Sequence, residues 1–213
     1  LANSPFYGFP SRIASVAHAV VVLGLNVVKG LTLCATAFDM MRNAGMNELW
    51  RHSLGVAMTA HILGTKAAMK NPEEVFVAGL LHDIGKVVLY VKWPDVGQQI
   101  TTVTRNTSRP LMDTEQELFE VTHADVGGWL ASAWHLPTSL REPILHHHTP
   151  AAAQDAKLQT AIVHVADVLV KGLACGNPGD DLVPPLSRQA WDLVGLDAQS
   201  LAHCLTQATE EFQ

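Results

Sequence analysis

The sequence has few charged residues, few aromatic residues and few cysteines, and these shortages exclude several classes of protein. Charged residues make up 16% of the 213 positions, whereas an average soluble domain has about 25%. Hydrophobic residues make up 48%, so the chain does not have the composition of a disordered protein. The formal net charge of −6 provides no basic surface for nucleic acid. We therefore expect a folded domain that does not bind nucleic acid.

Cysteine pairs and long hydrophobic runs are also missing. Cys34, Cys175 and Cys204 are far apart and odd in number, so we expect no disulfide framework and no cysteine zinc site. The longest apolar stretch, residues 16–33, is interrupted by polar residues and a glycine. It therefore predicts two short core helices rather than a membrane span. These features favour a cytoplasmic protein without membrane association.

Helical periodicity dominates the chain, and no segment combines strand-like alternation with the turn pairs that hairpins need. We predict an all-α fold: a single compact multi-helix domain over residues 1–175, followed over residues 176–213 by a loop and two short helices that pack on the domain or follow it. The expected helices cover residues 11–22, 26–41, 47–69, 72–90, a segment around 96–103, and residues 112–134, 138–148, 158–173, 187–194 and 198–212.

Histidine is abundant, with eleven residues against two tyrosines. The most informative word is His82-Asp83-Ile84-Gly85-Lys86. Adjacent His and Asp residues on a helix offer two ligands about 100° apart, and a carboxylate can bridge two cations. A single helix cannot complete such a coordination shell. Further ligands are available in apolar helical runs, where unpaired ionisable groups are costly: His52, His123, His147, His148 and Asp167.

The order and spacing of these words resemble the HDOD domain, an output domain of bacterial signalling proteins related to the HD superfamily of metal-dependent phosphohydrolases. The resemblance covers nearly the whole chain, although the N-terminal helices usual in the family are absent from this sequence. The matching words are Ala2-Asn3-Ser4, Leu49-Trp50-Arg51-His52-Ser53, Ala78-Gly79-Leu80-Leu81-His82-Asp83-Ile84-Gly85-Lys86, His123-Ala124-Asp125-Val126-Gly127, Trp134-His135-Leu136-Pro137 and His147-His148-Thr149-Pro150.

The resemblance implies a site for one or two divalent transition metals. One cation would be held by His52, His82, Asp83 and Asp167, and Asp83 would bridge to a second cation held by His123, His147 and His148. Lys86 would direct a positive charge toward a substrate phosphate, and with Asp83 it forms the candidate catalytic pair. Glu48 is a further candidate ligand. Imidazole and carboxylate ligands suit Fe, Mn, Zn or Ni alike.

Several of these residues also have structural interpretations. Lys86 can be the solvated end of a helix and Glu48 a surface charge near a helix start, both favoured by the helix dipole. We interpret His18, His61, His135, His164 and His203 as ordinary packed or surface residues, and the tryptophans at 50, 129, 134 and 191 as core residues. The Gly127-Gly128 pair indicates close helix packing beside His123.

Two functions of different classes follow from the resemblance. The first is a metal-binding regulatory or output module of bacterial signal transduction, whose partners are signalling proteins or flanking domains. The second is an active phosphohydrolase acting on a nucleotide or cyclic nucleotide. Relatives that hydrolyse cyclic-di-GMP carry a Gly-Tyr-Pro word, and this sequence contains none. A phosphodiesterase for cyclic-di-GMP is therefore disfavoured. A metal-free structural domain is the third interpretation.

Overall fold

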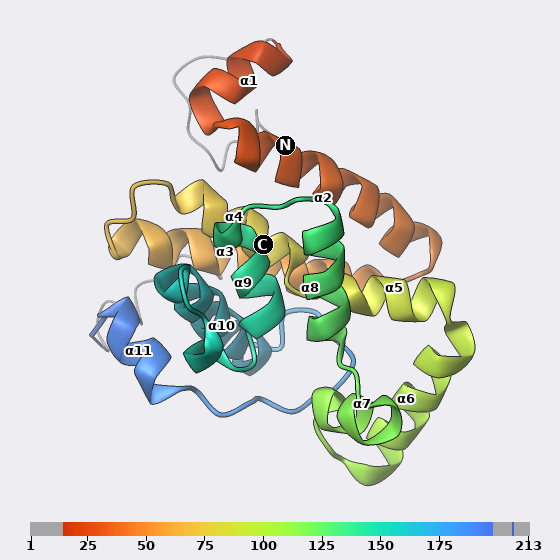
Figure 1. Cartoon of the computed structure of the whole chain (residues 1–213). Coiled ribbons are helices and arrows are strands. Elements are labelled where there is room, and N and C mark those ends of the chain that lie inside the picture. Colours follow the sequence, from red (N-terminus) through yellow and green to blue (C-terminus); the bar gives the residue numbers. More distant parts are fainter. Residues whose placement is uncertain (1–14, 198–205, 207–213) are drawn as a thin grey trace.

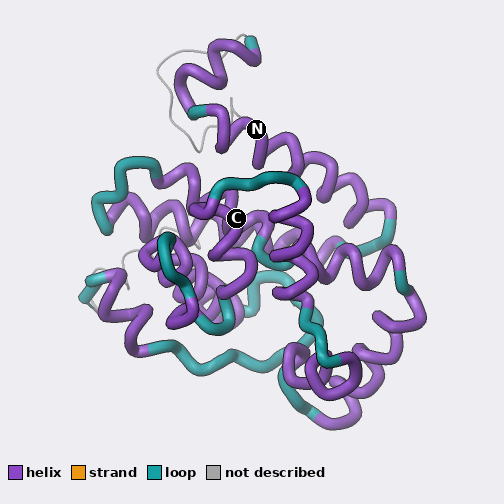
Figure 2. The backbone as a smooth tube through the Cα atoms, in the orientation of Figure 1, coloured by secondary structure: helices purple, strands orange, loops and turns teal. Residues whose placement is uncertain are grey.

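The computed structural model describes residues 15–197 and Thr206, and within these residues all regular structure is helical (Figures 1 and 2). The all-α prediction is confirmed. The helices are α1 (Val16–Leu23), α2 (Leu25–Asn43), α3 (Asn47–Lys66), α4 (Pro72–Leu81), α5 (Ile84–Lys92), α6 (Pro94–Thr107), α7 (Leu111–Phe119), α8 (His123–Ala133), α9 (Thr138–His146), the 3₁₀ turn Pro150–Ala152, α10 (Lys157–Gly172) and α11 (Arg188–Val194). The Asn-Ser word and the helix expected over 198–212 lie outside the described residues, apart from Thr206.

Helices α3, α4, α9 and α10 pack together at the centre of the molecule (Figure 1). The approach of α4 to α3 depends on Gly79, because a β-carbon there would lie 2.7 Å from the Cα atom of Ala57. Around this contact Leu63, Val77 and Ile162 have no exposed surface. Each such side chain contributes about 1.5–3 kcal/mol by burial. The close contact between Gly79 of α4 and Ala57 of α3 thus lies at the centre of the core.

Two of the expected long helices are each two helices, which corrects the sequence-based boundaries. The segment 72–90 is interrupted at His82–Asp83, where Asp83 takes the N-cap position of α5. The segment 112–134 is interrupted at Glu120, which has a left-handed φ of 55°. A capping box then starts α8, since the Thr122 side chain accepts from Asp125 N–H and the Asp125 side chain accepts from Thr122 N–H. Both breaks lie directly beside candidate metal ligands.

The first helix is less buried than the sequence predicts. Ser15 caps α1, and Gly24 ends it with a φ of 84°, a backbone conformation that glycine adopts readily. However, Val21 is 83% exposed and Val22 is 41% exposed, so α1 is not a core helix. No single described helix is both long enough and apolar enough to cross a membrane, although residues 17–23 and 25–43 meet these criteria as a pair bent by 115°.

The segment between α10 and α11, residues 173–187, runs back across the domain toward α7 (Figure 1). Gly176 passes so close to α3 that a β-carbon would lie 2.4 Å from both the carbonyl oxygen of Glu48 and the amide nitrogen of His52. Asp180 accepts hydrogen bonds from the Lys171 ammonium and from Leu111 N–H. This segment therefore packs on the domain and links α3, α7 and α10.

Candidate metal centre

The break between α4 and α5 places Asp83 in the interior, and close helix packing brings α8 to it. Gly85 follows Asp83 by two residues, and a β-carbon at Gly85 would lie 1.9 Å from the carbonyl oxygen of His123. The expected packing role of Gly127 is also observed, since a β-carbon there would lie 2.8 Å from Cγ2 of Ile144 in α9. These glycines allow α5, α8 and α9 to bring their polar residues to one point.

The two carboxylate oxygens of Asp83 face two different groups of ligands. Oδ2 lies 3.4 Å from His82 Nε2 and 3.9 Å from His52 Nε2. Oδ1 lies 3.3 Å from His123 Nε2 and 3.8 Å from His147 Nε2. Asp83 therefore stands between the two groups in the arrangement that a bridging carboxylate requires.

Each group contains residues close enough to share one cation. In the first, Asp167 Oδ1 lies 3.0 Å from His52 Nε2 and 3.9 Å from His82 Nε2. In the second, His123 Nε2 lies 2.9 Å from His148 Nε2. The structure thus brings together seven of the eight expected metal ligands. Their candidate ligand atoms lie within 4.8 Å of one another in three sets: His52, His82 and Asp167; His82, Asp83 and His147; and His123, His147 and His148.

Hydrogen bonds hold the ring proton on the Nδ1 atom of three histidines, so that the Nε2 atom of each faces the other candidate ligands. The Nδ1–H of His82 donates to the carbonyl oxygen of Gly79 at 2.7 Å, and that of His147 donates to Ile144 at 2.9 Å. The Nδ1–H of His123 donates to the Glu115 carboxylate at 2.6 Å. A neutral imidazole that donates through Nδ1 presents an unprotonated Nε2, and this is the usual second-shell arrangement of a metal-binding histidine.

Several buried polar atoms at the centre have no hydrogen-bond partner among the described residues. They are both ring nitrogens of His52, Nε2 of His82, Nε2 of His147 and Oδ1 of Asp83. His52 Nε2 lies close to Asp167 Oδ1, but the two groups are not aligned for a hydrogen bond. Unpartnered buried polar atoms are rare because each costs about 1–3 kcal/mol. A bound cation would satisfy these atoms, so the residues present fit a metal.

The ionisation states also fit cation binding. Burial lowers the pKa of His52, although Asp167 acts against this effect. Burial and the neighbouring histidines lower the pKa of His147 well below its usual range, and burial followed by His123 lowers the pKa of His148 to about 3. These rings are neutral at pH 7, which is the form that binds metals.

The two carboxylates are held ionised, and they raise the pKa of one of the histidines. Burial acts to raise the pKa of Asp83 and of Asp167. For Asp83 this effect is outweighed by His82 and Lys86, and for Asp167 by His52. Both pKa values therefore lie well below the usual range. For His82, burial acts to lower the pKa, yet the two carboxylates raise it.

Lys86 is buried, which excludes its interpretation as a solvated helix end. Its side chain is 5% exposed, and Nζ donates to Asp83 Oδ2 at 2.8 Å. Burial acts to lower the pKa of Lys86, but Asp83 outweighs it and raises the pKa. The ammonium is therefore engaged with the oxygen of Asp83 that faces His52 and His82.

Glu48 lies outside the cluster. Its side chain is 57% exposed and accepts from Arg51 at 3.3 Å, and the Glu48 carbonyl accepts from Asn177 N–H. Its position corresponds to the surface-charge interpretation. Another expectation is wrong: Trp129 is 60% exposed rather than in the core.

Glu115 and His164 are structural partners of the site that sequence reasoning missed. Glu115 is fully buried and accepts from both the Nδ1–H and the backbone N–H of His123. His164 is also buried, donates from Nδ1 to the His147 carbonyl at 2.7 Å, and accepts at Nε2 from Ser187 N–H. The contact of Glu115 with His123 could have been anticipated, because Thr122-His123-Ala124-Asp125 has the spacing of a capping box and so predicts a helix start. A helix start there allows the chain to fold Glu115 back onto His123.

We predict that Glu115→Gln weakens metal binding about 10- to 100-fold, the usual effect of losing a second-shell carboxylate. The amide has the shape of the carboxylate but carries no charge, and it can present its NH₂ group to His123. Isothermal titration of Mn²⁺ or Zn²⁺ into chelator-treated protein measures the change. Glu117→Gln is the matched control, because Glu117 is 61% exposed and pairs with Arg109. Equal affinities in the two variants would exclude a role for Glu115.

A known protein family matches this chain. The family model of the HDOD domain matches residues 1–150. This is more than half of the chain, and the chain belongs to the HDOD family.

Individual relatives are more distant. A protein of Treponema pallidum (strain Nichols), described as uncharacterized, is 24% identical over 188 residues, which are 85% of this chain and 36% of the relative. The chain thus spans little more than a third of that protein. The crystal structure of an HDOD domain protein of unknown function from Geobacter sulfurreducens is 27% identical, with a TM-score of 0.76 over 99% of this chain and 76% of the other. A candidate signal transduction protein from Marinobacter aquaeolei VT8 is 20% identical, with a TM-score of 0.71 over 99% of this chain and 48% of the other.

Proposed function

We propose that this chain is a regulatory module of bacterial signal transduction whose buried His/Asp cluster binds one or two divalent transition metals. The observation that carries the metal site is the position of Asp83, whose two oxygens face two separate groups of Nε2 atoms. His52, His82 and Asp167 would hold one cation, and His123, His147 and His148 the other. Mixed imidazole and carboxylate ligands suit Fe, Mn, Zn or Ni.

The signalling role is supported by family membership and by the described relative from Marinobacter aquaeolei VT8. The interior position of the site supports a structural use of the metal, since Asp83, His123 and His147 are almost completely buried. A metal bound by side chains from α3, α8 and α10, from the junction between α4 and α5 and from the residues that follow α9 would hold these elements in one arrangement. The partners are other signalling proteins or domains flanking this one in the same cytoplasmic protein.

A phosphohydrolase acting on a nucleotide or cyclic nucleotide is the second candidate. It is favoured by the shared Asp83, because two cations bridged by one carboxylate can clamp both oxygens of a phosphoryl transfer and activate a water molecule. Against it, the Lys86 ammonium is bound to Asp83 rather than free to receive a phosphate. The Gly-Tyr-Pro word is absent as well. We expect no appreciable hydrolysis of cyclic-di-GMP in a phosphodiesterase assay with Mn²⁺ or Fe²⁺.

Metal removal tests the proposed function through stability. Because the ligands come from separate helices, a bound metal stabilises the folded chain by about 2.7 kcal/mol at a metal concentration of 100 Kd. We expect chelation to lower the Tm by several degrees and added Mn²⁺ or Zn²⁺ to restore it, as measured by circular dichroism. A Tm that is insensitive to both treatments would contradict the metal site.

A further inference from the structure

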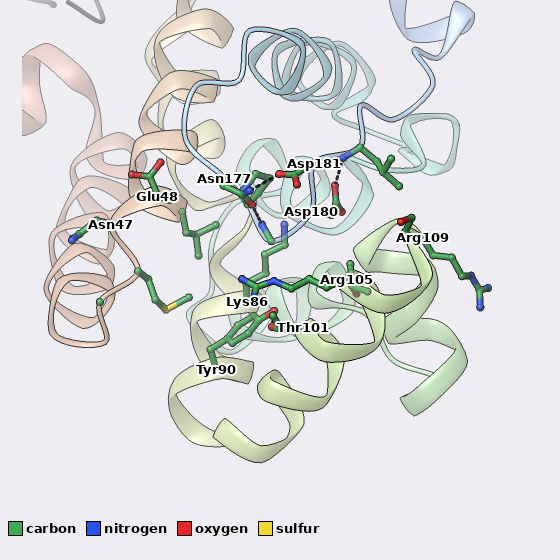
Figure 3. A pocket seen from close by; sticks show the side chains of 18 residues that line it. Asn47, Glu48, Lys86, Tyr90, Thr101, Arg105, Arg109, Asn177, Asp180 and Asp181 are labelled. Atoms are coloured by element: carbon green, nitrogen blue, oxygen red, sulfur yellow. Dashed lines mark hydrogen bonds between the residues drawn. The ribbon is translucent and has the colours of Figure 1, made fainter.

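Residues 175–187 run from the end of α10 to the start of α11 and form a strap across the domain (Figure 1). The strap lies outside residues 1–150, to which the match with the HDOD family model is confined. In Figure 3 it forms one wall of a cavity of about 750 Å³, and Asn177 lies on this wall. Lys86 lines the same cavity, and its Nζ donates to Asp83. The strap therefore borders the side from which the cavity reaches the metal cluster.

Apolar burial contributes little to holding the strap in place. Its side chains Leu182, Val183 and Leu186 are between 37% and 52% exposed, and Pro178 is its one buried residue. A segment with few buried apolar contacts opens locally at a much lower free energy than the core. The closed position of the strap therefore depends mainly on individual hydrogen bonds and ion pairs to the helices beneath it.

Asp180 attaches the middle of the strap to two helices. Its carboxylate accepts from the Lys171 ammonium at 2.7 Å and from the Leu111 N–H at 2.9 Å. Lys171 follows the candidate ligand Asp167 by four residues on α10. Leu111 precedes Glu115, the partner of a histidine ligand, by four residues on α7. Because residues four apart lie one turn away on the same helix face, Asp180 ties together two helices that each position a part of the metal cluster.

The two ends of the strap are attached beside other ligands of the cluster. At its start, a β-carbon at Gly176 would lie 2.4 Å from the amide nitrogen of His52. At its end, the Ser187 N–H donates to Nε2 of His164 at 3.0 Å. The Nδ1–H of His164 donates in turn to the carbonyl oxygen of His147 at 2.7 Å. The position of the strap and the positions of the ligands are therefore linked at three places along its length.

We propose that closing of the strap is coupled to metal binding, with Asp180 as the positioning residue that connects the two. This inference rests on the proposed metal-binding function. A cation fixes His52, His147 and Asp167 relative to one another, and the closed strap is attached beside these same residues. By linkage, the metal favours the closed strap, and the closed strap raises the metal affinity by the same factor. The strap leads into α11, so metal occupancy changes how firmly α11 is held.

Hydrogen exchange of the wild-type 213-residue chain, followed by mass spectrometry of its fragments, measures opening of the strap without any substitution. Saturating Zn²⁺ is expected to slow amide exchange in residues 175–187 about tenfold, within the usual range of allosteric coupling. The candidate ligands all lie outside α1, so exchange in α1 is expected to stay unchanged. Equal exchange of the strap with and without bound Zn²⁺ would overturn the coupling, and so would an equal slowing in α1, which indicates general stabilisation.

Asp180→Asn separates a positioning role from a role in stability alone. Co²⁺ titrated into chelator-treated protein reports the affinity and, through its visible absorption, the geometry of the bound ion. We expect Asp180→Asn to bind Co²⁺ about tenfold more weakly, at the lower end for outer partners of a metal site. The absorption of bound Co²⁺ is expected to change, and metal is expected to no longer slow exchange of the strap. A variant with a lower Tm but unchanged affinity and absorption would exclude Asp180 as a positioning residue.

Asp181→Asn is the matched control, because Asp181 adjoins Asp180, carries the same charge and accepts from the Asn177 side chain within the strap. It is expected to keep the affinity and the absorption of the wild type. Equal affinities in Asp180→Asn and Asp181→Asn, whether reduced or not, would overturn the role of Asp180 and leave the metal site standing. A wild-type chain that binds neither Zn²⁺ nor Co²⁺ would contradict the proposed function as well.

Discussion

Asp83→Asn is expected to abolish metal binding in both groups at once. The amide keeps the shape of the carboxylate and can accept the Lys86 hydrogen bond through its remaining oxygen, so the variant is expected to fold. It cannot bridge two cations, because it has one oxygen and lacks the negative charge that faces His82 and His123. Metal analysis by mass spectrometry, on protein purified without chelator, measures the metal content per chain.

The control for this variant is Asp39→Asn. Asp39 is 64% exposed and pairs with Arg42 on the surface of α2. The Asp39→Asn variant is therefore expected to keep the wild-type metal content and to lose less than about 1 kcal/mol of stability. The Asp83→Asn chain is also expected to lose the stabilisation by added metal. Undiminished metal content in Asp83→Asn would exclude Asp83 as the bridge between the two groups.

Gly85→Ala is expected to destabilise the metal-free protein by about 3–5 kcal/mol. Single substitutions have effects of this size only where they cause severe steric clashes or packing defects. The added methyl group would lie 1.9 Å from the His123 carbonyl oxygen and 2.9 Å from the amide nitrogen of Gly127. Both are backbone atoms and cannot rotate away, so α5 and α8 have to separate. The separation also moves His123 away from Asp83. Urea unfolding followed by circular dichroism measures the first effect, and metal titration measures the second.

Gly172→Ala is the matched control at the end of α10. A β-carbon there meets no atom within 4 Å, and alanine reduces the freedom of the unfolded chain. We expect a stabilisation of about 0.4–1 kcal/mol. If Gly85→Ala were as stable as Gly172→Ala, the close contact between α5 and α8 would not exist.

The helical class and several members of the buried His/Asp cluster could be predicted because both depend on residue type. Apolar periodicity marks helices even where their ends are misjudged, and a buried His or Asp in an apolar run is costly without a partner. For this reason His52, His123 and Asp167 could be selected from separate helices. Cluster geometry could not be derived in the same way, because the distances from Asp83 depend on how α4, α5 and α8 pack.

The residues that were missed depend on breaks in helices. A continuous helix over 112–134 places Glu115 two turns away from His123, so no contact between them is expected. The left-handed Glu120 and the Thr122 cap reverse the chain and create the contact. Likewise, the burial of Lys86 follows from the break at His82–Asp83 and from the helices packed around it. The Glu115–His123 contact and the burial of Lys86 depend on tertiary packing, which cannot be predicted from the hydrophobic periodicity of one sequence.

The central claim is that the buried cluster binds metal, and anomalous X-ray diffraction tests it most directly. Crystals of the wild-type chain grown with Mn²⁺ are measured on both sides of the manganese absorption edge. We expect an anomalous peak among His52, His82, Asp83 and Asp167, or among Asp83, His123, His147 and His148, or two peaks with Asp83 between them. Crystals without an anomalous peak at these residues, from protein saturated with Mn²⁺, would contradict the metal site.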